Sequence, residues 1–537
     1  MVTGVTLDPT TATNELVDIV VQAEAGTITR ANAVSRVSAA HLEAILHTQF
    51  EDAGHVIATG IGASPGAAVG KVYFTSDDAL DADDRGEAII LVRAETSPAD
   101  VMGMQISRGI VTSRGGLASH AALVARGWGT PAIVGAQALE ISDKSFTVGD
   151  VVVHEGDVIS IDGSTGEVVL GELTTSHSER PPEFEVLLGW ADDIRAGKMS
   201  VRANADTAED AAMARELGAE GIGLCRTEHM FLAPERLPIV REMILADTPE
   251  AEAATLEALR VAQQADFEEV LASMDGFPVT VRLLDPPLHE FLPSVAELKI
   301  EAATVGLDAF AQRELVAAEA WAEHNPMIGT RGVRLGVMKP GLYAMQVRAL
   351  IDAAVALAER GCHPIVEVMI PLTVNREELA LARSWVQTEL EASEHKPENI
   401  TIGTMIETPR AAMCGEQLAE EADFFSFGTN DLTQLTFGFS RDDVERRMMP
   451  AYLEQGLLPA NPFDTIDQVG VGRLVEQGVC SGRTTKPDLK IGVCGEHGGD
   501  PESIDFFYRM GLDYVSCSPY RVPIARLAAA QAIIRHD

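Results

Sequence analysis

The sequence predicts an α/β protein in which a (β/α)8 barrel follows a smaller β/α domain. The first observation is a regular alternation of apolar runs with helical patterns over residues 198–537. The second is a series of short β-rich runs separated by glycine turns over 53–175. A helical pattern within 1–52 precedes both parts, and residues 176–197 predict a linker between them.

The elements before the barrel follow from periodicity and from turn residues. Apolar residues at helical spacing over 15–48 predict two helical runs with a break at Gly26. The β-rich run 88–93 predicts a strand, and 158–170, with a glycine-containing turn at its centre, predicts a β-hairpin. The polar, proline-containing stretch 174–182 predicts the start of the linker.

Eight apolar runs predict the strands of the barrel, and helical segments such as 208–217 and 377–392 lie between them. The runs are 201–204, 221–225, 279–284, 364–370, 401–405, 423–427, 490–494 and 513–517. Such barrels build their active sites at the carboxyl ends of the strands. Polar residues at those ends are therefore the candidates for function.

Composition and charge restrict the class of protein. Of 537 residues, 46% are hydrophobic and 23% charged, values typical of a globular protein with a large core. A formal net charge of −40 argues against nucleic acid and anionic membranes as partners, because like charges repel. No uninterrupted apolar stretch is long enough to span a membrane, and the N-terminus lacks the pattern of a secretory signal. Six cysteines without close pairing predict reduced thiols and a cytoplasmic location.

The stretch GGLASHAALVARG over 115–127 predicts a tight turn that delivers His120 to the first turn of a helix. Ser119 is a residue type that caps helix N-termini. The positive end of the helix dipole disfavours imidazolium and favours an attached anion, so His120 would stay neutral and nucleophilic. This pattern alone leaves two interpretations open, a phosphoryl-carrying histidine and an ordinary histidine in a surface turn.

Polar residues also follow several of the predicted barrel strands. Taken singly, an arginine at a strand end is usually a surface ion-pair partner, and a lone cysteine is usually buried packing. Their coincidence at one end of the barrel favours a site. The residues are Arg226, Arg282, Arg331, Glu407, Asn430, Asp431 and Cys494.

Five stretches resemble the phosphoenolpyruvate (PEP)-utilising enzymes, which include pyruvate phosphate dikinase, PEP synthase and Enzyme I of the sugar phosphotransferase system. The stretch 115–127 is similar to the phosphohistidine segment of that family. Four further stretches are similar to segments of the family's pyruvate-binding barrel. They are GIGLCRTEHMF, GTMIETPR, FFSFGTNDLTQ and GVCGEHGG, which start at residues 221, 403, 424 and 492. The ending DYVSCSPYRVPIARLAAAQ from 513 is similar to the pyruvate phosphate dikinases within the family.

The resemblance implies a reaction that cleaves PEP, and the residue types fit it. Arg226, Arg282 and Arg331 would clamp phosphate and enolate oxygens, because guanidinium groups bind such oxygens in pairs. Glu407 and Asp431 would hold Mg²⁺, which keeps several waters and takes further ligands from the substrate. Phosphoryl transfer depends mostly on such positioning and charge stabilisation.

The remaining roles concern the substrate and the two reacting groups. Asn430 and the backbone at Gly428 and Thr429 would hold the substrate. Cys494 would protonate the enolate at its methylene carbon to give pyruvate, which is general acid catalysis. His120 would be the nucleophile that takes the phosphoryl group. The small domain over 53–175 would then be the swivelling domain that carries His120.

Two other patterns carry less weight. The run from Gly66 to Lys71 is one residue short of a phosphate-binding loop, and Val72 stands where that loop needs Ser or Thr. Cys494 and His497 form a lone pair without the further ligands that zinc requires. We expect neither nucleotide binding nor a zinc site at these positions.

The sequence departs from the family pattern in three places. We expect no nucleotide-binding ATP-grasp region like the one that precedes the phosphohistidine domain of the dikinases, because 1–52 resembles only the end of that region. The interval from Gly66 to His120 is too short for the helical domain by which Enzyme I docks its protein acceptor. Ala118 replaces the threonine that dikinases commonly carry, so regulation by phosphorylation of that residue is not expected.

These departures leave three functions open. The first is the catalytic half of a split pyruvate phosphate dikinase, with a separate ATP-binding protein that phosphorylates His120. The second is a PEP–protein phosphotransferase that passes phosphate to a protein acceptor. The third is a regulator that binds PEP without turnover. The resemblance also implies a homodimer formed through the barrel.

Overall fold

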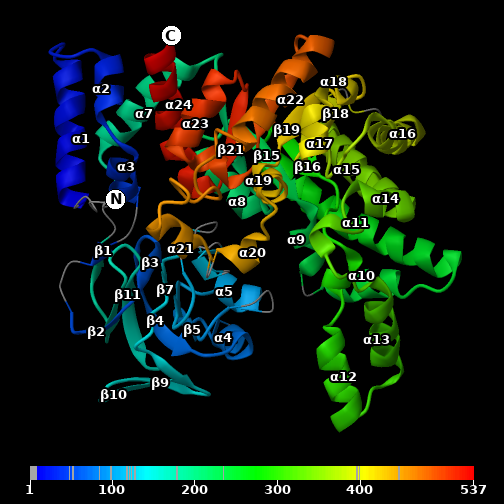
Figure 1. Cartoon of the computed structure of the whole chain (residues 1–537), viewed down its shortest axis with the longest axis horizontal. Helices are drawn as coiled ribbons and strands as arrows, with labels where there is room; N and C mark the ends of the chain where they lie inside the picture. The colour runs from blue at the N-terminus through cyan, green and yellow to red at the C-terminus, as the bar shows by residue number, and fades with distance from the viewer. Residues whose placement is uncertain are drawn as a thin grey trace. The chain divides into compact units, whose positions relative to one another are not determined.

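The computed structural model describes residues 9–46, 49–50, 54–83, 85–96, 100–116, 119, 121–122, 124–125, 129–176, 180–233, 235–394, 397, 399–445 and 448–537. It confirms the predicted class, because a β-rich domain precedes a closed barrel of eight parallel strands. The chain forms two compact units (Figure 1). One consists of residues 1–195, 438–461 and 526–537, and the other of residues 196–437 and 462–525.

Helices open the first unit, as the pattern over 15–48 predicts. They are α1 (Pro9–Glu24), α2 (Arg30–Arg36) and α3 (Ala39–Leu46). The chain turns between α1 and α2 at Gly26, whose φ of 73° suits glycine. Thr29 caps α2 by accepting a hydrogen bond from the backbone N–H of Asn32 at 3.1 Å. A second break at Val37 and Ser38 separates α2 from α3, which the sequence pattern did not reveal.

The stretch expected as a linker, 176–197, is for the most part a helix. Helix α7 (Pro182–Arg195) packs against α1 and α2, as Figure 1 shows. Its buried face includes Phe184, Leu187 and Leu188, which recur at helical spacing. In the sequence, the proline at 182 suggests a loop. Proline is also favoured in the first turn of a helix, and that is its position here.

The β-rich domain is built on a mixed eight-stranded sheet in the order β2-β12-β11-β4-β5-β6-β7-β3. Its strands are β2 (Val56–Thr59), β3 (Ile61–Ser64), β4 (Ala67–Tyr73), β5 (Ile89–Arg93), β6 (Gly109–Thr112), β7 (Ala132–Val134), β11 (Val158–Asp162) and β12 (Glu167–Leu170). The pairing of β11 with β12 confirms the predicted hairpin. Strands β4 to β7 run parallel, and β5 is buried on both faces, as an all-apolar strand should be.

Smaller elements complete this domain. They are α4 (Ser76–Asp83), α5 (Val101–Gln105), the sheet of β8 (Glu140–Ser142), β9 (Ser145–Val148) and β10 (Val151–His154), and the pair β1 (Gln49–Phe50) and β13 (Thr175–Ser176). Strand β4 contains all but the first residue of the run that mimics a phosphate-binding loop. An extended, paired strand cannot wrap a phosphate, so this geometry agrees with setting the run aside.

All eight predicted barrel strands are present, and β14 pairs with β21 to close the barrel. They are β14 (Ser200–Asn204), β15 (Ile222–Arg226), β16 (Pro278–Arg282), β17 (Ile365–Ile370), β18 (Ile400–Ile406), β19 (Phe424–Phe427), β20 (Lys490–Val493) and β21 (Tyr514–Cys517). Most of their residues are buried, because each strand packs one face into the barrel interior and the other against the surrounding helices.

Helices follow every strand of the barrel. Those after successive strands are α8 (Ala208–Glu216), α11 (Pro249–Ser273), α15 (Pro340–Glu359), α16 (Arg376–Ala392), α17 (Pro409–Met413) with α18 (Gly415–Leu418), α22 (Val471–Thr485), α23 (Pro501–Arg509) and α24 (Val522–His536). Figure 1 shows α11 beside α15, and the two helices are in contact. Helix α15 is long and apolar enough to span a membrane by length and composition, but 61% of that stretch is buried, as in a core helix.

Further helices are inserted between strands and helices. They are α9 (Thr227–Leu232), α10 (Leu237–Ile244), α12 (Val295–Thr304), α13 (Ala309–Trp321), α14 (Val333–Met338), α19 (Thr429–Phe437), α20 (Arg441–Val444) and α21 (Met448–Glu454). Short 3-10 turns lie at η2 (Leu288–Phe291), η3 (Pro326–Ile328), η4 (Glu496–Gly499) and η5 (Pro519–Arg521). Several of these insertions begin at the carboxyl ends of strands, where they carry candidate site residues.

The barrel interior contains charged side chains as well as apolar ones. Glu367 on β17 accepts hydrogen bonds from Arg202 on β14 at 2.7 Å and from Thr280 on β16 at 2.7 Å. It also pairs with Lys490 on β20. Arg202 lies over the ring of Tyr514 at 4.0 Å. Because Arg202 and Glu367 are almost fully buried, these contacts tie five strands together across the barrel.

Candidate active site

The structure places the predicted barrel residues at or just beyond the carboxyl ends of strands. Arg226 and Arg282 are the last residues of β15 and β16, and Glu407 directly follows β18. Cys494 directly follows β20. The segment 428–431 follows β19 and includes the start of α19. Arg331 lies two residues before α14, where the sequence predicts it to open a helix.

Two of the three arginines belong to one chain of ion pairs. Arg282 pairs with Glu228 on α9 and, at 3.0 Å, with Asp285. Asp285 also pairs with Arg331, and Arg331 contacts Asp431 at 3.3 Å. Anions and cations thus alternate from Glu228 to Asp431. These groups are mostly buried, so each charge depends on its neighbours in the chain.

Arg226 is held by a different carboxylate, that of Asp206, which follows β14. Asp206 accepts hydrogen bonds from the backbone N–H of Arg226 at 2.6 Å and from its guanidinium at 3.3 Å. Arg226 is the most exposed of the three arginines, with 29% of its side chain open to solvent, against 9% for Arg282 and 11% for Arg331. It is therefore the arginine that an incoming anion can reach with least rearrangement.

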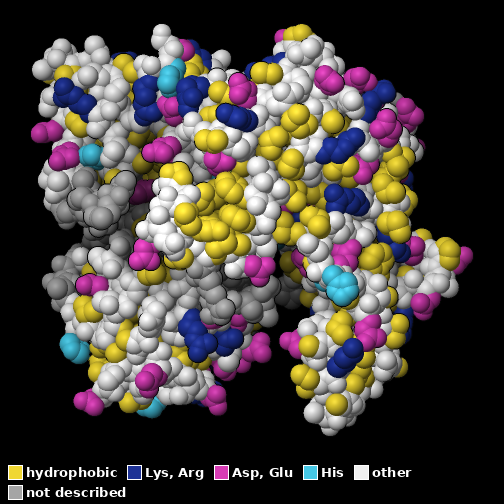
Figure 2. All heavy atoms as spheres, viewed as in Figure 1, with side chains coloured by type: hydrophobic (Ala, Val, Ile, Leu, Met, Phe, Trp, Pro, Cys, Tyr) yellow, Lys and Arg dark blue, Asp and Glu magenta, His cyan; other side chains and the backbone are white. Residues whose placement is uncertain are grey.

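The buried arginines belong to a chain that is strongly negative overall. Acidic side chains are scattered over the face drawn in Figure 2, in keeping with the net charge of −40. An anionic substrate would be repelled by such a surface. Arg282 and Arg331 are placed below the surface, where low dielectric strengthens their attraction for a bound anion.

Glu407 is completely buried in the same site. Its Oε1 accepts a hydrogen bond from the backbone N–H of Leu372 at 2.5 Å. Its Oε2 has no hydrogen-bond partner among the residues that the structure describes. Burial, together with the negative charges of Asp431 and Asp285, raises the pKa of Glu407 to about 8, although Arg331 and Arg282 oppose the shift.

Leu372 holds an unusual backbone conformation beside Glu407. Its φ is 59°, in the left-handed region that non-glycine residues rarely adopt, and its side chain is buried. This conformation directs the Leu372 N–H toward Glu407. A strained residue at a candidate site is consistent with a backbone fixed for function.

The carboxylates fit the predicted Mg²⁺. Glu407 has a buried oxygen without a partner among the described residues. Its raised pKa reflects burial first and then repulsion from Asp431 and Asp285, and a cation would relieve that repulsion. The four carboxylates Glu228, Asp285, Glu407 and Asp431 face two guanidiniums. Their net charge is −2 when all are ionised, and one divalent ion would neutralise it.

A dedicated cage of protein ligands is not needed for such an ion. Within the described part of the chain, no group of three or more His, Cys, Asp or Glu has the arrangement of a metal centre. Mg²⁺ typically takes one or two carboxylates and completes its shell with waters and substrate oxygens. Glu407 and Asp431 are therefore sufficient as its protein ligands.

Glycines allow the backbone around the start of α19 to approach its neighbours closely. A Cβ at Gly428 would lie 2.7 Å from Glu407 Oε2, and one at Gly495 would lie 2.0 Å from the Thr429 hydroxyl. Asn430 accepts a hydrogen bond from the backbone N–H of Glu496 at 3.1 Å. The N-terminus of α19 is thus packed against the turn after β20, which places Gly428, Thr429, Asn430 and Asp431 beside Glu407.

His497 is part of this packing and does not form a zinc pair with Cys494. Its Nδ1 lies 2.8 Å from the Thr429 hydroxyl and its Nε2 lies 2.9 Å from the carbonyl oxygen of Pro462. Since a carbonyl can only accept, Nε2 donates to Pro462, and Nδ1 shares its hydrogen bond with the Thr429 hydroxyl. Both nitrogens are engaged, in agreement with the interpretation of the sequence.

The Cys494 thiol is buried at the carboxyl end of β20. It packs with Leu224, Met369, Met405 and Phe424 in one apolar cluster. Burial raises the pKa of this thiol to about 11, so it is protonated at neutral pH. The charges of Glu407, Arg282 and Arg226 also act on the thiol, which places it within electrostatic range of the other site residues.

His120 and Ala118 lie outside the described residues. The neighbouring positions agree with the predicted turn and helix. Gly115 has a φ of 108°, and the Ser119 hydroxyl accepts a hydrogen bond from the backbone N–H of Ala122 at 3.4 Å. Residues 121–122 and 124–125 are helical. Ser119 therefore caps this helix as the sequence predicts.

Three carboxylates of the site were missed by reasoning from the sequence. Asp206, Glu228 and Asp285 each lie within three residues of a strand end, and Asp285 follows Arg282 by three residues. Carboxylates just beyond strands one, two and three would have been found by applying the strand-end rule to acids as strictly as to arginines. What the sequence could not supply is their pairing.

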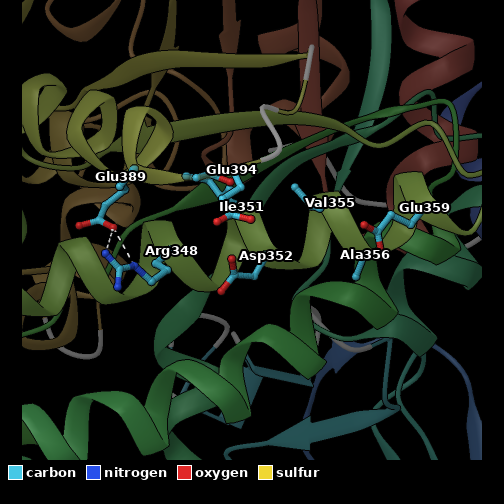
Figure 3. Close-up of a pocket in the computed structure, with 10 residues that line it drawn as sticks. Arg348, Ile351, Asp352, Val355, Ala356, Glu359, Glu389 and Glu394 are labelled. Atoms are coloured by element: carbon cyan, nitrogen blue, oxygen red, sulfur yellow. Dashed lines mark hydrogen bonds and ion pairs between the residues drawn. The ribbon is translucent and has the colours of Figure 1, made fainter.

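A separate cavity of about 440 Å³ lies between α15 and α16 (Figure 3). Arg348 in its wall donates to Glu389 at 2.8 and 2.6 Å, and Asp352, Glu359 and Glu394 add further carboxylates. None of its lining residues belongs to the set described above. With its one arginine paired, this cavity offers no free cation to a phosphorylated ligand, so the strand-end set is the candidate active site.

Comparison with known proteins agrees with this geometry. Residues 183–534 match the PEP-binding domain of PEP-utilising enzymes, and residues 86–166 match the mobile domain of the same enzymes. The first match alone covers more than half of the chain. The chain belongs to the PEP-utilising enzyme family.

Relatives within this family include plant pyruvate, phosphate dikinases. The chain is 49% identical over 526 residues to the chloroplastic enzyme of Flaveria trinervia and 50% identical over 526 residues to pyruvate, phosphate dikinase 2 of Zea mays. Each alignment covers 95% of this chain, but 54% and 59% of the respective relative. The chain therefore spans little more than half the length of the curated relatives it matches.

Proposed function

We propose that this chain is a phosphotransferase that interconverts PEP and pyruvate through a phosphohistidine at His120. The observation that carries the proposal is the alternating chain of buried ion pairs from Glu228 to Asp431, which ends beside Glu407 and its unpartnered oxygen. Such a site has the guanidiniums to bind a phosphorylated carboxylic acid and the carboxylates to bind its metal ion. Kinship with pyruvate, phosphate dikinases supports the choice of substrate.

Substrate binding would redistribute the contacts of the arginines. Arg226, Arg282 and Arg331 would exchange part of their carboxylate contacts for phosphate and enolate oxygens of PEP. Glu407 and Asp431 would hold Mg²⁺, which supplies positive charge beside those oxygens when bound. Asn430 and the backbone at the start of α19 would orient the carboxylate end of the substrate. These interactions position the phosphoryl group and stabilise the charge that develops as it leaves.

The proton step would use Cys494. When the phosphoryl group leaves PEP for the His120 imidazole, the P–O bond breaks and its electron pair remains on the enolate. The enolate carbon then takes the proton of the Cys494 thiol, which gives pyruvate and a thiolate. The raised pKa of Cys494 keeps the thiol protonated until that moment, and Arg282 and Arg226 lower the cost of the resulting negative charge.

The phosphoryl group on His120 must exchange with a second partner. We propose that this partner is an ATP-grasp nucleotide-binding protein, as in a split pyruvate phosphate dikinase. Transfer from ATP to His120 in the presence of that protein would support this arrangement, whereas transfer from His120 to another acceptor protein would favour a PEP–protein phosphotransferase. The homodimer implied by family resemblance remains a prediction.

Isotope exchange between labelled pyruvate and PEP tests the half-reaction with this chain and Mg²⁺ alone. We expect label to move into PEP, because transfer to His120 is reversible, and we expect His120→Ala to abolish the exchange. As a matched control, His154→Ala changes an exposed histidine on β10 and should leave exchange unaltered. Exchange that persists in His120→Ala would contradict the phosphohistidine, and PEP binding without exchange in the unaltered chain would point to a regulator.

A further inference from the structure

His229 forms a cluster with Asp206 and Arg226 that lies outside the chain of ion pairs. Asp206 follows β14, Arg226 ends β15, and His229 lies on α9, the helix that begins directly after Arg226. All three therefore stand at the carboxyl end of the barrel. The mechanism above assigns a role to Arg226 and none to Asp206 or His229.

Asp206 binds both cationic neighbours through its carboxylate. Its Oδ1 accepts the backbone N–H of Arg226 at 2.6 Å, and its Oδ2 accepts the Arg226 guanidinium at 3.3 Å. Oδ2 also lies 2.8 Å from Nδ1 of His229. With only 12% of its side chain exposed, Asp206 is a buried carboxylate that fixes an arginine and a histidine side by side.

Contact with Asp206 sets the protonation of His229. Burial alone would lower the pKa of the imidazole, but attraction and hydrogen bonding by Asp206 outweigh it, and Glu228 adds to the effect. The pKa of His229 is therefore raised above its ordinary value, although Arg226 opposes the shift. The same contacts hold the pKa of Asp206 below its usual range despite burial. Asp206 thus favours the doubly protonated, positively charged ring.

The free side of the imidazole is available to a ligand. About half of the His229 side chain, 52%, is exposed. Its second nitrogen, Nε2, makes no hydrogen bond to any residue that the structure describes, so it has a donor to offer when the ring is charged. Arg226, on the same carboxylate, is the most exposed arginine of the site. Two adjacent cations with unused donors are suited to a doubly charged anion.

We propose that His229, held by Asp206, is a further anion-binding residue that donates its Nε2–H to the phosphoryl group of the substrate beside Arg226. Since PEP as the ligand rests on the function proposed above, this inference extends that function by one residue. Asp206 is then a positioning residue, because it acts on the phosphoryl group only through Arg226 and His229.

Other charged groups near α9 are engaged elsewhere. Glu228, on the same helix, pairs with Arg282. Helix α10 packs against α9, and its Glu242 is exposed. The arginines at the start of α10 and within it pair with other acids: Arg236 with Asp266 and Arg241 with Glu314. Asp206 is accordingly the one described carboxylate in contact with the His229 ring.

Binding of PEP and of oxalate, measured by calorimetry with saturating Mg²⁺ between pH 7 and 9, tests this assignment. Oxalate has the shape and charge of enolpyruvate but no phosphoryl group. The phosphoryl group of PEP stays doubly charged over this range, because its second pKa is about 6. Comparing variants at each pH removes the contribution of every group that titrates in all of them.

We expect His229→Gln to weaken PEP binding about tenfold at pH 7 and much less at pH 9, since it removes a charge-assisted hydrogen bond that the unaltered protein itself loses as pH rises. Oxalate binding should not change. His229→Arg should restore PEP affinity and keep it constant with pH, and Asp206→Asn should move the loss of affinity to lower pH.

Equal PEP affinities of His229→Gln and the unaltered protein across this range would overturn the role of His229 alone. An equal loss of PEP and oxalate binding in His229→Gln would also overturn it, because it would show a structural effect on the whole site. If the unaltered protein binds neither ligand with Mg²⁺, the function proposed above fails as well.

Discussion

The surroundings of Cys494 suit this buried side chain to the role proposed for it. An exposed thiol is partly ionised near neutral pH, whereas the pKa of Cys494 is raised to about 11 by burial. At the same time Arg282 and Arg226 lie near enough to stabilise the thiolate once the proton has gone. The apolar cluster therefore keeps the thiol protonated, and the arginines reduce the free-energy cost of forming the thiolate.

We predict that Cys494→Ala lowers pyruvate–PEP exchange by about 10²- to 10⁴-fold, the usual contribution of a general acid, with little change in PEP affinity. Loss of affinity together with turnover would instead indicate a collapsed site. Cys480→Ala is the matched control, because that cysteine is exposed on α22 and should leave the exchange rate unaltered.

The negative charge of Glu407 lowers the stability of the metal-free protein. Its carboxylate is buried, one oxygen lacks a partner among the described residues, and Asp431 and Asp285 repel it. Because its pKa is raised to about 8, ionisation of Glu407 above its unfolded pKa of about 4.3 works against folding of the metal-free protein. Removing the charge should relieve that penalty.

Glu407→Gln is therefore expected to stabilise the metal-free protein by about 1–3 kcal/mol at pH 8 and to abolish exchange activity. Thermal unfolding with and without Mg²⁺ measures the stability and the metal binding, since Mg²⁺ should raise the melting temperature of the unaltered chain and not of the variant. Pyruvate–PEP exchange measures the loss of activity. A variant less stable than the unaltered protein in the absence of Mg²⁺ would refute this account of Glu407.

At the scale of elements, the barrel is held together by charge as well as by apolar packing. Glu367 on β17 links Arg202, Thr280 and Lys490, which stand on three other strands. Burial alone would raise the pKa of Glu367, but Arg202 and Lys490 lower it to about 2. The stabilisation from this depressed pKa is present above the unfolded pKa of about 4.3 and is lost as pH falls toward 2.

Glu367→Gln should destabilise the barrel by about 3–5 kcal/mol, because it leaves Arg202 buried without its counter-charge. Chemical denaturation followed at pH 7 and again near pH 3 measures the effect, which should shrink at the lower pH. Glu319→Gln is the control. Glu319 on α13 pairs with Lys299 on α12, and both side chains are exposed, so we expect the free energy of unfolding to change by at most about 0.5 kcal/mol.

At the scale of the whole molecule, the negative net charge opposes the positive side chains that are proposed to bind the substrate. The chain carries −40, yet the proposed substrate is an anion that must reach Arg226, Arg282 and Arg331. Long-range repulsion by surface carboxylates is screened by salt, whereas attraction by buried arginines at contact is screened much less. Salt should therefore weaken the barrier to approach more than it weakens the bound state.

We predict that the KM for PEP falls when ionic strength is raised from about 10 mM to about 150 mM, over which the Debye length shortens from roughly 30 to 8 Å. The KM for pyruvate, which carries fewer charges, should fall less. Steady-state exchange in buffers of fixed free Mg²⁺ gives both values. A KM for PEP that rises with salt would mean that the arginines dominate even at long range.

Most of the fold was predictable from the sequence because its signals are local. Eight apolar runs gave the eight strands, the turn in 158–170 gave a hairpin, and Ser119 gave a helix cap. Helix α7 was not predicted, because a proline such as Pro182 occurs both at helix starts and in linkers. Packing of the helix, which the local sequence does not show, decides between the two. The break at Val37 was missed for a similar reason, since helical spacing resumes directly after it.

The sequence by itself determined the barrel, the family, and the end of the barrel at which polar residues gather. Those conclusions need only periodicity and the order of residues along one strand and its following turn. Tertiary structure alone decided which charges meet: Asp285 with both Arg282 and Arg331, Asp206 with His229, and Leu372 with Glu407. The physical reason is that an ion pair or a hydrogen bond depends on distances of a few ångströms between strands, and these are fixed only when the barrel closes.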